Sequence, residues 1–427
     1  MTITRLRGAE SFRARLVLAT ISGRPVRIDG IREDDAVAPG LREHEASLLR
    51  LLEKVSRGAA VEINETGTTL RYRPGVLVGG AVEHECPASR GVGYFVEALL
   101  LLGLFGRKPL RATLRGVTCG GLDGSADAWR TVGLPLVRRC LGVGVQKAAS
   151  PGDANFAAAA ADAAAAALGG GTVAAGDLAL RLVRRGVPPL GGGEVVLDVP
   201  CVRCLPPLTL LDEGAVRRVR GVAFAARVAP AAAARAVDGA RGVLNALLAD
   251  VFVFTDHAPG QATGGLSPGY GLTLVAETTS GCLLGAEACS SRESGGDLKT
   301  SATTSGSARN PAVAAAAAAA SSSPRPPPPL SPEEVGSLAA QALLDEVDRG
   351  GVCSAGHQGL LLLLAACSDA SASQVRLGPL TPHAAATLRA LRDILGIEFA
   401  LRPEPRSRTV FASCIGAGLR NTSRVAT

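Results

Sequence analysis

Three times along the chain, a helical pattern is followed directly by two short stretches that are typical of strands. The helices are expected at residues 41–55, 129–141 and 383–395. The strand pairs are expected at 61–63 with 68–72, 177–184 with 194–197, and 398–401 with 409–412. A recurring helix–strand–strand order restricts the fold to tandem units in which helices cover one face of each sheet, an α+β layering.

A different pattern lies between residues 200 and 265. A strand at 219–228, an alanine-rich helix at 230–249 and a buried strand at 251–254 predict a small α/β unit. Residues 148–176 and 291–330 are rich in alanine, glycine, serine and proline, and we interpret both as low-complexity surface insertions. A capping-box pattern at Ser331-Pro332-Glu333-Glu334 then predicts a helix that runs to about Val347.

The charge balance favours acidic partners. The 427 residues carry a formal net charge of +7, and a basic protein attracts polyanions such as RNA. Only 3% of the residues are aromatic, which argues against a surface that stacks bases. We therefore expect any contact with RNA to be mainly electrostatic and to weaken in salt.

Neither a metal site nor a membrane span is indicated. The ten cysteines lie mostly in apolar stretches, as expected for small buried side chains in a reducing compartment. Cys201 and Cys204 form the one CxxC, and no second ligand pair follows, so zinc is not expected. The longest apolar stretch, 92–105, contains Glu97 and is too short to span a bilayer, so it predicts a buried helix. We expect no metal, no cofactor and no membrane contact.

The segment from Arg184 to Val195 carries the most specific local motif. Two arginines precede a proline corner, three glycines follow at 191–193, and a β-rich run begins after them. Glycines permit positive φ and close backbone approach, and guanidinium groups match phosphate oxygens. The same pattern also fits a tight turn between strands with solvated arginines.

This segment resembles the RGxxPxGGGEV signature of the RNA 3′-terminal phosphate cyclase superfamily. Other segments match in the same order: Ser22–Val26, Pro39–Arg42, Gly67–Leu70, Leu114–Thr118, Ser125–Asp127, Ser267–Leu272 and Val275–Gly281. The resemblance implies tandem βαβαββ repeats with a small inserted α/β domain. It assigns residues 1–199 and 266–427 to the repeat domain and 200–265 to the inserted domain.

The chain departs from the cyclases where their nucleophile would lie. In the cyclases, the histidine of a His-x-x-Asp-Gln pattern takes AMP from ATP. The matching segment here ends in Gln358, so the resemblance puts Ser354 at the nucleophile position and His357 at the aspartate. A nucleophile moved by three residues would not point at the same phosphate. The N-terminal cyclase motif is also eroded, with Glu10 in place of a glutamine.

Residues 12–18, 41–47 and 62–70 look like the non-catalytic, nucleolar branch of the superfamily. That resemblance implies a ribosome biogenesis factor without cyclase activity in the nucleus and nucleolus. It would act on pre-rRNA within the small-subunit processome and bind a large nucleolar ribosome-assembly GTPase. A pre-rRNA endonuclease is the alternative, and an active ATP-dependent RNA 3′-phosphate cyclase is a weaker one.

Four arginines match basic positions around the cyclase cleft: Arg13, Arg42, Arg184 and Arg185. We expect them to line a groove that binds an RNA phosphate rather than ATP. The competing interpretation is that some of them form structural ion pairs.

Two aspartates are the candidates for a nuclease. Asp123 and Asp127 flank Ser125, and paired carboxylates of this kind could hold Mg²⁺ for phosphodiester cleavage. Aspartate also suits a helix start, through capping and the helix dipole. His257 follows Asp256 at a strand end, but it has no identifiable serine or cysteine partner, so we interpret it as structural.

Overall fold

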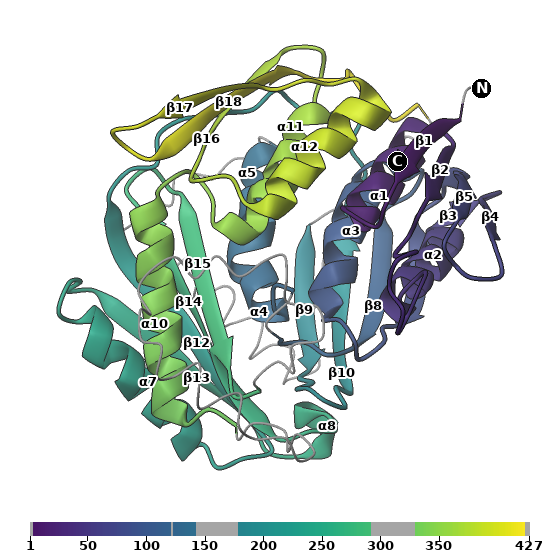
Figure 1. Cartoon of the computed structure of the whole chain (residues 1–427). Coiled ribbons are helices and arrows are strands. Elements are labelled where there is room, and N and C mark those ends of the chain that lie inside the picture. Colours follow the sequence, from purple (N-terminus) through teal and green to yellow (C-terminus); the bar gives the residue numbers. More distant parts are fainter. Residues whose placement is uncertain (1–2, 121–122, 142–177, 292–328, 423–427) are drawn as a thin grey trace.

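The computed structural model describes residues 3–120, 123–141, 178–291 and 329–422. Within them, four four-stranded sheets and one two-stranded ribbon are packed with helices (Figure 1). The two low-complexity stretches expected at 148–176 and 291–330 lie outside the described residues, except for positions 291, 329 and 330.

The first repeat occupies the N-terminal part of the chain. Its elements are β1 (Thr4–Arg7), α1 (Phe12–Ser22), β2 (Val26–Asp29), α2 (Glu43–Val55), β4 (Ala60–Ile63) and β5 (Leu70–Arg73). The spatial order of its strands is β1-β2-β5-β4, with β1 parallel to β2 and the remaining pairs antiparallel. A short ribbon of β3 (Ser56–Arg57) and β6 (Val76–Leu77) leads out of the repeat.

The second repeat follows with the same order of elements. They are β7 (Gly80–Glu85), α3 (Val92–Leu104), β8 (Leu110–Gly116), α4 (Ala126–Ala128), η1 (Trp129–Gly133), α5 (Leu134–Cys140), β9 (Ala179–Arg184) and β10 (Gly193–Val199). The strands are arranged β7-β8-β10-β9, which is the arrangement of the first repeat. Ser125 is the N-cap of the short helix α4, and its hydroxyl accepts a hydrogen bond from the Ala128 amide.

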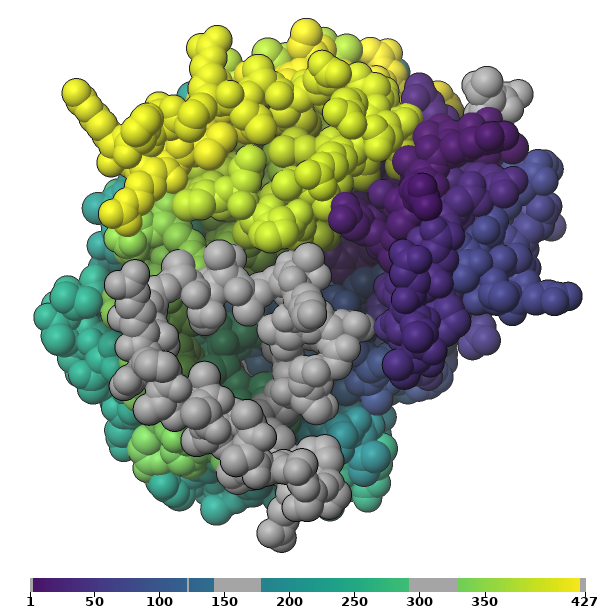
Figure 2. Space-filling view, viewed as in Figure 1, coloured from purple at the N-terminus to yellow at the C-terminus, as the bar shows by residue number. Residues whose placement is uncertain are grey.

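The third repeat is split in the sequence. Its elements are β11 (Thr209–Leu210), η2 (Ala355–His357), α11 (Gln358–Ala366), β16 (Ala372–Leu377), α12 (Pro382–Leu395), β17 (Ala400–Glu404) and β18 (Thr409–Ile415). The strand order β11-β16-β18-β17 repeats the pattern once more, which confirms the predicted tandem βαβαββ architecture. Figure 2 shows the purple surface of the first repeat adjoining the yellow surface of the third.

The inserted domain interrupts the third repeat between β11 and η2. It consists of β12 (Val216–Ala226), α7 (Ala231–Leu244), β13 (Val251–Ala258), α8 (Gln261–Gly264), β14 (Gly269–Thr278), β15 (Leu283–Cys289) and α10 (Pro332–Arg349). Its sheet has the order β13-β12-β14-β15. The sheet therefore continues well past residue 265, where we expected the inserted domain to end, because β12 pairs along its length with β14. The predicted capping box at Ser331 does begin α10.

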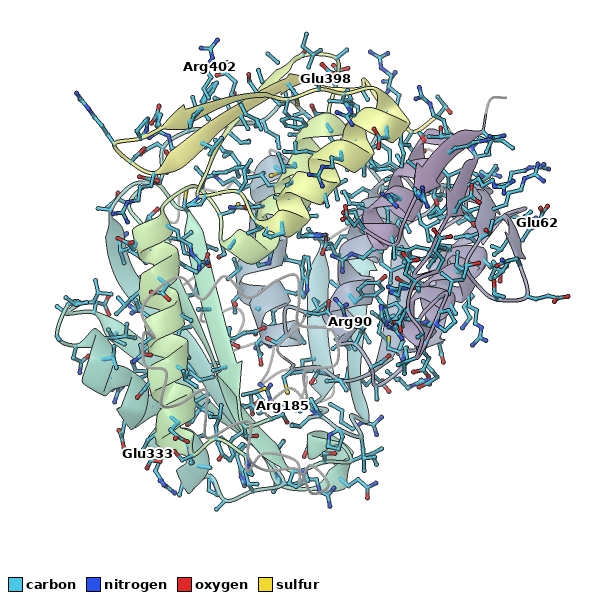
Figure 3. All side chains as sticks on the ribbon, viewed as in Figure 1. Glu62, Arg90, Arg185, Glu333, Glu398 and Arg402 are labelled. Atoms are coloured by element: carbon cyan, nitrogen blue, oxygen red, sulfur yellow. The ribbon has the colours of Figure 1, made fainter. Side chains whose placement is uncertain are left out.

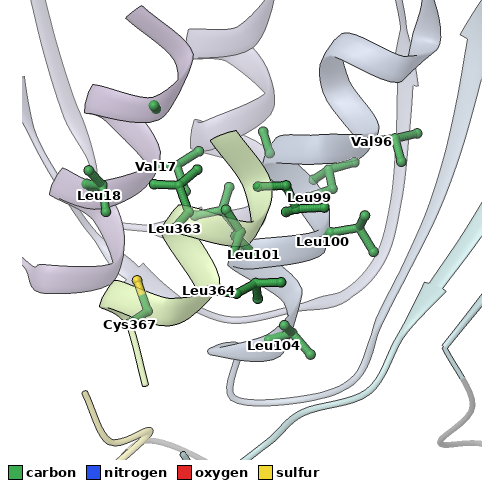
Figure 4. Packing of buried hydrophobic residues seen from close by; sticks show 14 of the residues in the cluster. Val17, Leu18, Val96, Leu99, Leu100, Leu101, Leu104, Leu363, Leu364 and Cys367 are labelled. Atoms are coloured by element: carbon green, nitrogen blue, oxygen red, sulfur yellow. The ribbon is translucent and has the colours of Figure 1, made fainter. Parts of the chain in front are cut away.

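The first helices of the three repeats meet at the centre of the molecule. Figure 4 shows aliphatic side chains of α1, α3 and α11, including Val17, Leu99 and Leu363, packed against one another. Every residue of α3 is buried, so the buried helix expected at 92–105 is confirmed. Among the helices of the described residues, none has the length and apolar character needed to cross a bilayer.

The glycine-rich motif forms the connection between β9 and β10. Val187 and Gly191 pair across the turn, and Gly191 has φ of +65°. A Cβ on Gly186 would lie 2.3 Å from the Gly193 amide nitrogen, so no larger side chain fits there without displacing the backbone. The motif is therefore a close approach of two backbone segments, and its arginines are described below.

Candidate functional site

Two arginines and a tyrosine form a stacked cluster where α1 meets the start of α3. The guanidinium carbons of Arg13 and Arg90 lie 4.8 and 4.9 Å from the centre of the Tyr94 ring. Arg13 is ion-paired with Glu97, and Arg90 makes two hydrogen bonds of 2.6 and 2.7 Å with Asp123. Both positive charges are thus balanced by carboxylates, and the cluster joins the first repeat to the second.

His44 completes this cluster from the start of α2. Its ring packs edge-on against Tyr94 with 5.3 Å between the ring centres. Burial, together with the nearby Arg90, lowers the pKa of His44 to about 4. The imidazole is therefore neutral at physiological pH and adds no charge to the cluster.

A cavity of about 360 Å³ lies between the repeats and the inserted domain. Four carboxylate side chains line it: Asp123, Glu287, Asp345 and Glu346. Arg349 is the one arginine or lysine among the described lining residues, and it is paired with Glu346 at 2.8 Å. The lining of the cavity is therefore acidic in composition, with Asp123 and Glu346 each offset by an arginine.

Ser354, which the resemblance puts at the position of the cyclase nucleophile, and His357 lie on the wall of this cavity. The Ser354 hydroxyl is buried and accepts a hydrogen bond of 2.7 Å from the Gly285 amide of β15. His357 packs edge-on against Trp129 of η1, and burial lowers its pKa to about 4. Among the described residues, the Gly285 amide is the hydrogen-bond partner of the Ser354 hydroxyl.

Glu287 of β15 is the most perturbed carboxyl group of the cavity. One oxygen accepts a hydrogen bond of 2.9 Å from the Ser125 amide, and the other has no hydrogen-bond partner among the described residues. Burial raises the pKa of Glu287 to about 7, although the bond from Ser125 works against this shift.

Arg185, one of the four predicted arginines, is a buried connector between the second repeat and the inserted domain. Its side chain is 5% exposed and bonds to Asp127 of α4 and Asp256 of β13, at 2.7 Å each. Its guanidinium carbon lies 4.4 Å from the centre of the Phe224 ring of β12. Its donors face protein carboxylates, so this geometry supports the structural ion pair over the phosphate contact.

The other predicted arginines are also paired, and they lie on different elements. Arg42 begins α2 and donates a hydrogen bond of 2.8 Å to Asp35. Arg184 lies 3.6 Å from Glu194 on the neighbouring strand β10. Arg13, Arg42, Arg184 and Arg185 share no partner among the ion pairs of the described residues. Each of the four arginines is thus offset by carboxylates of its own, and their role in binding an RNA phosphate stays a prediction.

The two nuclease candidates are likewise engaged with arginines. Asp127 bonds to Arg130 at 3.0 Å as well as to Arg185. Although burial alone would raise its pKa, these two arginines hold the pKa of Asp127 below its ordinary value. Asp123 is occupied by Arg90. In the part of the chain that the structure describes, no group of three or more His, Cys, Asp or Glu side chains is arranged to hold a metal ion.

The structure also places His257 and shows several residues of the candidate site that the sequence did not identify. The ring of His257 is 3.2 Å from the Val228 carbonyl, which agrees with a structural role. Arg90, Tyr94 and Glu287 were not identified as site residues. Glu97 did carry a signal, because a lone carboxylate inside an apolar helix needs a buried partner. Figure 3 shows Arg90 and Arg185 towards the middle of the molecule, with Arg402 at its periphery.

The fold and its inserted sheet correspond to a known class of proteins. The family model described as RNA 3′-terminal phosphate cyclase matches residues 4–151, and the model of that family's insert domain matches residues 211–348. The chain therefore belongs to the RNA 3′-terminal phosphate cyclase family. The range of the insert match also agrees with the inserted sheet and α10 rather than with an end at residue 265.

Similar proteins within this family are described as cyclase-like. Probable RNA 3′-terminal phosphate cyclase-like protein of Arabidopsis thaliana is 41% identical, with 98% of each chain covered. RNA 3′-terminal phosphate cyclase-like protein of Homo sapiens is 39% identical, over 98% of this chain and 96% of the human one. A Schizosaccharomyces pombe relative described as an rRNA processing protein is 36% identical, over 99% of this chain and 98% of its own. The predicted cyclase-like branch is thereby confirmed.

Proposed function

We propose that this protein is a ribosome biogenesis factor without cyclase activity that acts in small-subunit pre-rRNA processing. It would work in the nucleolus, as part of the processome, together with a large nucleolar ribosome-assembly GTPase. The name of the Schizosaccharomyces pombe relative supports a role in rRNA processing. The net charge of +7 is compatible with a pre-rRNA partner.

The environment of Ser354 is the observation that carries the non-catalytic part of this proposal. A cyclase needs an activated nucleophile facing the α-phosphate of ATP. Here the aligned position holds a buried hydroxyl that accepts a bond from the Gly285 amide, in a cavity lined by carboxylates. The nearby His357 is buried and neutral, because burial lowers its pKa to about 4.

An adenylylation and cyclisation assay tests this part. The purified protein would be mixed with labelled ATP, Mg²⁺ and an RNA that ends in a 3′-phosphate. We expect no covalent AMP adduct and no 2′,3′-cyclic end, in the wild type or in a Ser354→Ala variant. An adduct on the wild type would contradict the proposal. Its loss in Ser354→Ala or in His357→Ala would then identify the nucleophile.

A complementation experiment tests the biological part. The rRNA processing protein of Schizosaccharomyces pombe would be depleted and replaced by this chain, and the precursors of the small-subunit rRNA would be followed by northern blotting. We expect processing to be restored and the protein to co-purify with a nucleolar GTPase. Unrestored processing, with the chain expressed at a normal level, would overturn the assignment.

A further inference from the structure

Several exposed basic residues without a carboxylate partner lie on neighbouring segments that the sequence did not single out. Five of the exposed side chains that make no ion pair within the described part of the chain lie on these segments: Arg57, Arg73, Arg107, Lys108 and Arg203. We call these five residues the basic surface. The predicted arginines, in contrast, are each engaged with carboxylates.

Backbone contacts bring the separate segments of the basic surface together. Arg57 of β3 pairs with Val76 of β6, three residues after Arg73. The amides of Arg107 and Lys108 donate hydrogen bonds of 3.2 and 3.0 Å to the carbonyls of Leu77 and Val78. Residues 57, 73–78 and 107–108 are therefore neighbours, although they are up to 51 positions apart in the sequence.

Asn421 connects the fifth cation to the same place. Its side-chain amide donates a 2.8 Å hydrogen bond to the Gly106 carbonyl, and its backbone amide donates one of 2.8 Å to the Arg203 carbonyl. Arg203 thus lies beside the turn that carries Arg107. The basic surface lies at the end of the second sheet where β7 and β8 begin and β10 ends.

Gly79 keeps the two turns of the basic surface in contact. It has φ of +74°, and a Cβ on it would lie 2.0 Å from the Lys108 carbonyl oxygen. Only glycine permits this approach, since any side chain would push the 106–109 turn away. Gly79 therefore has a structural purpose here: it places Lys108 beside β6.

We propose that the basic surface binds the phosphate backbone of single-stranded RNA, and this inference rests on the proposed role in pre-rRNA processing. Four of its five cations are arginines, whose planar donors match phosphate oxygens. Of the large hydrophobic residues that are exposed in the described part of the chain, only Val76 lies within the basic surface. The basic surface therefore lacks the apolar centre that a protein partner would bury. Recognition by charge also fits the small number of aromatic residues, 3% of the chain.

The test compares two triple variants with the same change of net charge. The first, Arg57→Gln with Arg107→Gln and Lys108→Gln, removes three cations of the basic surface. The control, Arg235→Gln with Arg392→Gln and Arg408→Gln, removes three exposed arginines that lie outside the basic surface and are each paired with a carboxylate. Binding to a fluorescein-labelled 20-nucleotide oligouridylate would be measured by anisotropy between about 50 and 300 mM KCl, after melting curves have shown that both variants are folded.

The first variant should bind roughly tenfold or more weakly at about 100 mM salt, and its plot of log affinity against log salt should be flatter by about 2 units, since each phosphate contact to a single strand contributes about 0.7. The control should stay close to the wild type. The inference is overturned if the wild type does not bind this RNA, if the first variant binds as the wild type does, or if the control loses as much. An oligoglutamate peptide of equal charge that binds as tightly would assign the surface to an acidic protein segment instead.

The same variants separate this inference from the proposed function. Suppose that the wild-type chain restores pre-rRNA processing in the complementation experiment. If the first variant then binds RNA as tightly as the wild type and restores processing equally well, the inference alone fails. If the wild-type chain restores nothing, the proposed function fails, whatever the binding experiment gives.

Discussion

Arg185 shows how burial decides what an arginine does. In water, its guanidinium group would be free to meet a phosphate, but here it is enclosed by Asp127, Asp256 and the Phe224 ring. Asp127 is itself buried and depends on Arg130 and Arg185 to stay charged. The pairs thus stabilise each other, and removal of one member leaves a charge without compensation.

We expect Arg185→Ala to lower the free energy of unfolding by about 3–5 kcal/mol, because Asp127 and Asp256 lose their shared partner inside the protein. Arg408→Ala removes an arginine that is 75% exposed and pairs with an equally exposed Asp348, so it should change the free energy by less than about 0.5 kcal/mol. Urea denaturation of both variants checks this. Similar effects of the two substitutions would show that the buried network contributes little.

A second residue-scale prediction concerns pH. The pKa of Glu287 is raised from 4.5 to about 7 in the folded protein, so folding favours its protonated form. This contribution to stability is complete below about pH 4.5 and is lost as the pH rises through about 7. Glu287→Gln keeps a neutral side chain at every pH. Relative to the wild type, the variant should therefore gain up to about 3 kcal/mol between pH 4.5 and pH 8.

Denaturation of the two proteins at both pH values measures this difference, and the titration of every other group cancels in the comparison. If the difference in the free energy of unfolding between the variant and the wild type stays the same across this range, the pKa of Glu287 is not raised by folding.

Sequence reasoning named the right kinds of residue but could not supply their partners. Arg185 and Asp127 were both identified, yet as members of a phosphate groove and of a nuclease site. Asp256, the second partner of Arg185, is 71 positions away and on a strand of the inserted domain. Such pairing depends on the packing of two sheets, so it cannot be predicted from the local motif around Arg184 and Arg185.

At the scale of elements, α7 and α10 of the inserted domain pack with almost no space between their backbones. A Cβ on Gly336 would lie 2.0 Å from the Ala236 carbonyl oxygen, and one on Gly239 would lie 2.6 Å from the Glu333 carbonyl. Two helices approach this closely only where small residues face each other. The alanines of α7 thus have two effects: they favour the helix, and they leave room for the close contact with α10.

The same substitution at two glycines should have opposite effects. Gly336→Ala must push α10 away from α7, so we expect it to lower the free energy of unfolding by about 1–3 kcal/mol. Gly242→Ala lies on the exposed face of α7 with nothing within 4 Å of the added carbon. It should raise the free energy by up to about 1 kcal/mol, because alanine favours the helix. Thermal and urea denaturation decide, and a stabilising Gly336→Ala would refute the tight contact.

Local patterns predicted the elements better than they predicted the domain limits. The helix–strand–strand order of all three repeats, and the strand, helix and strand of residues 216–258, were visible from periodicity and turn residues. The end of the inserted domain was not, since β14 pairs with β12 across the intervening α7, β13 and α8. The pairing of distant strands is set by the whole sheet, which a local pattern does not encode.

On the scale of the molecule, the inserted domain is joined to the repeats at two adjacent points. The Gly351 amide donates a hydrogen bond of 2.6 Å to the Glu213 carboxylate, so the chain leaves the third repeat and returns to it at almost one place. Of the buried residues in the main hydrophobic core, only Cys282 comes from the inserted domain. The repeats therefore have nearly all of their core without it.

We expect a chain in which residues 214–350 are replaced by a short glycine-serine linker to fold. It should be soluble and should show a single cooperative thermal transition by circular dichroism, at a lower temperature than the full chain because the Arg185–Asp256 pair and the contacts of β15 are lost. Aggregation, or melting without cooperativity, would show that the repeats depend on the inserted domain for their fold.

Trp129 is the only tryptophan of the chain. It is 4% exposed, packs against His357 and lies on η1, where Val132 faces β15 of the inserted domain. Under excitation at the long-wavelength edge, where the three tyrosines absorb little, the fluorescence of the unlabelled protein therefore comes from a single emitter at the junction of the inserted domain and the repeats. A red shift of its emission would report the separation of the two parts, in real time and at micromolar concentration, while unfolding elsewhere would leave the spectrum unchanged.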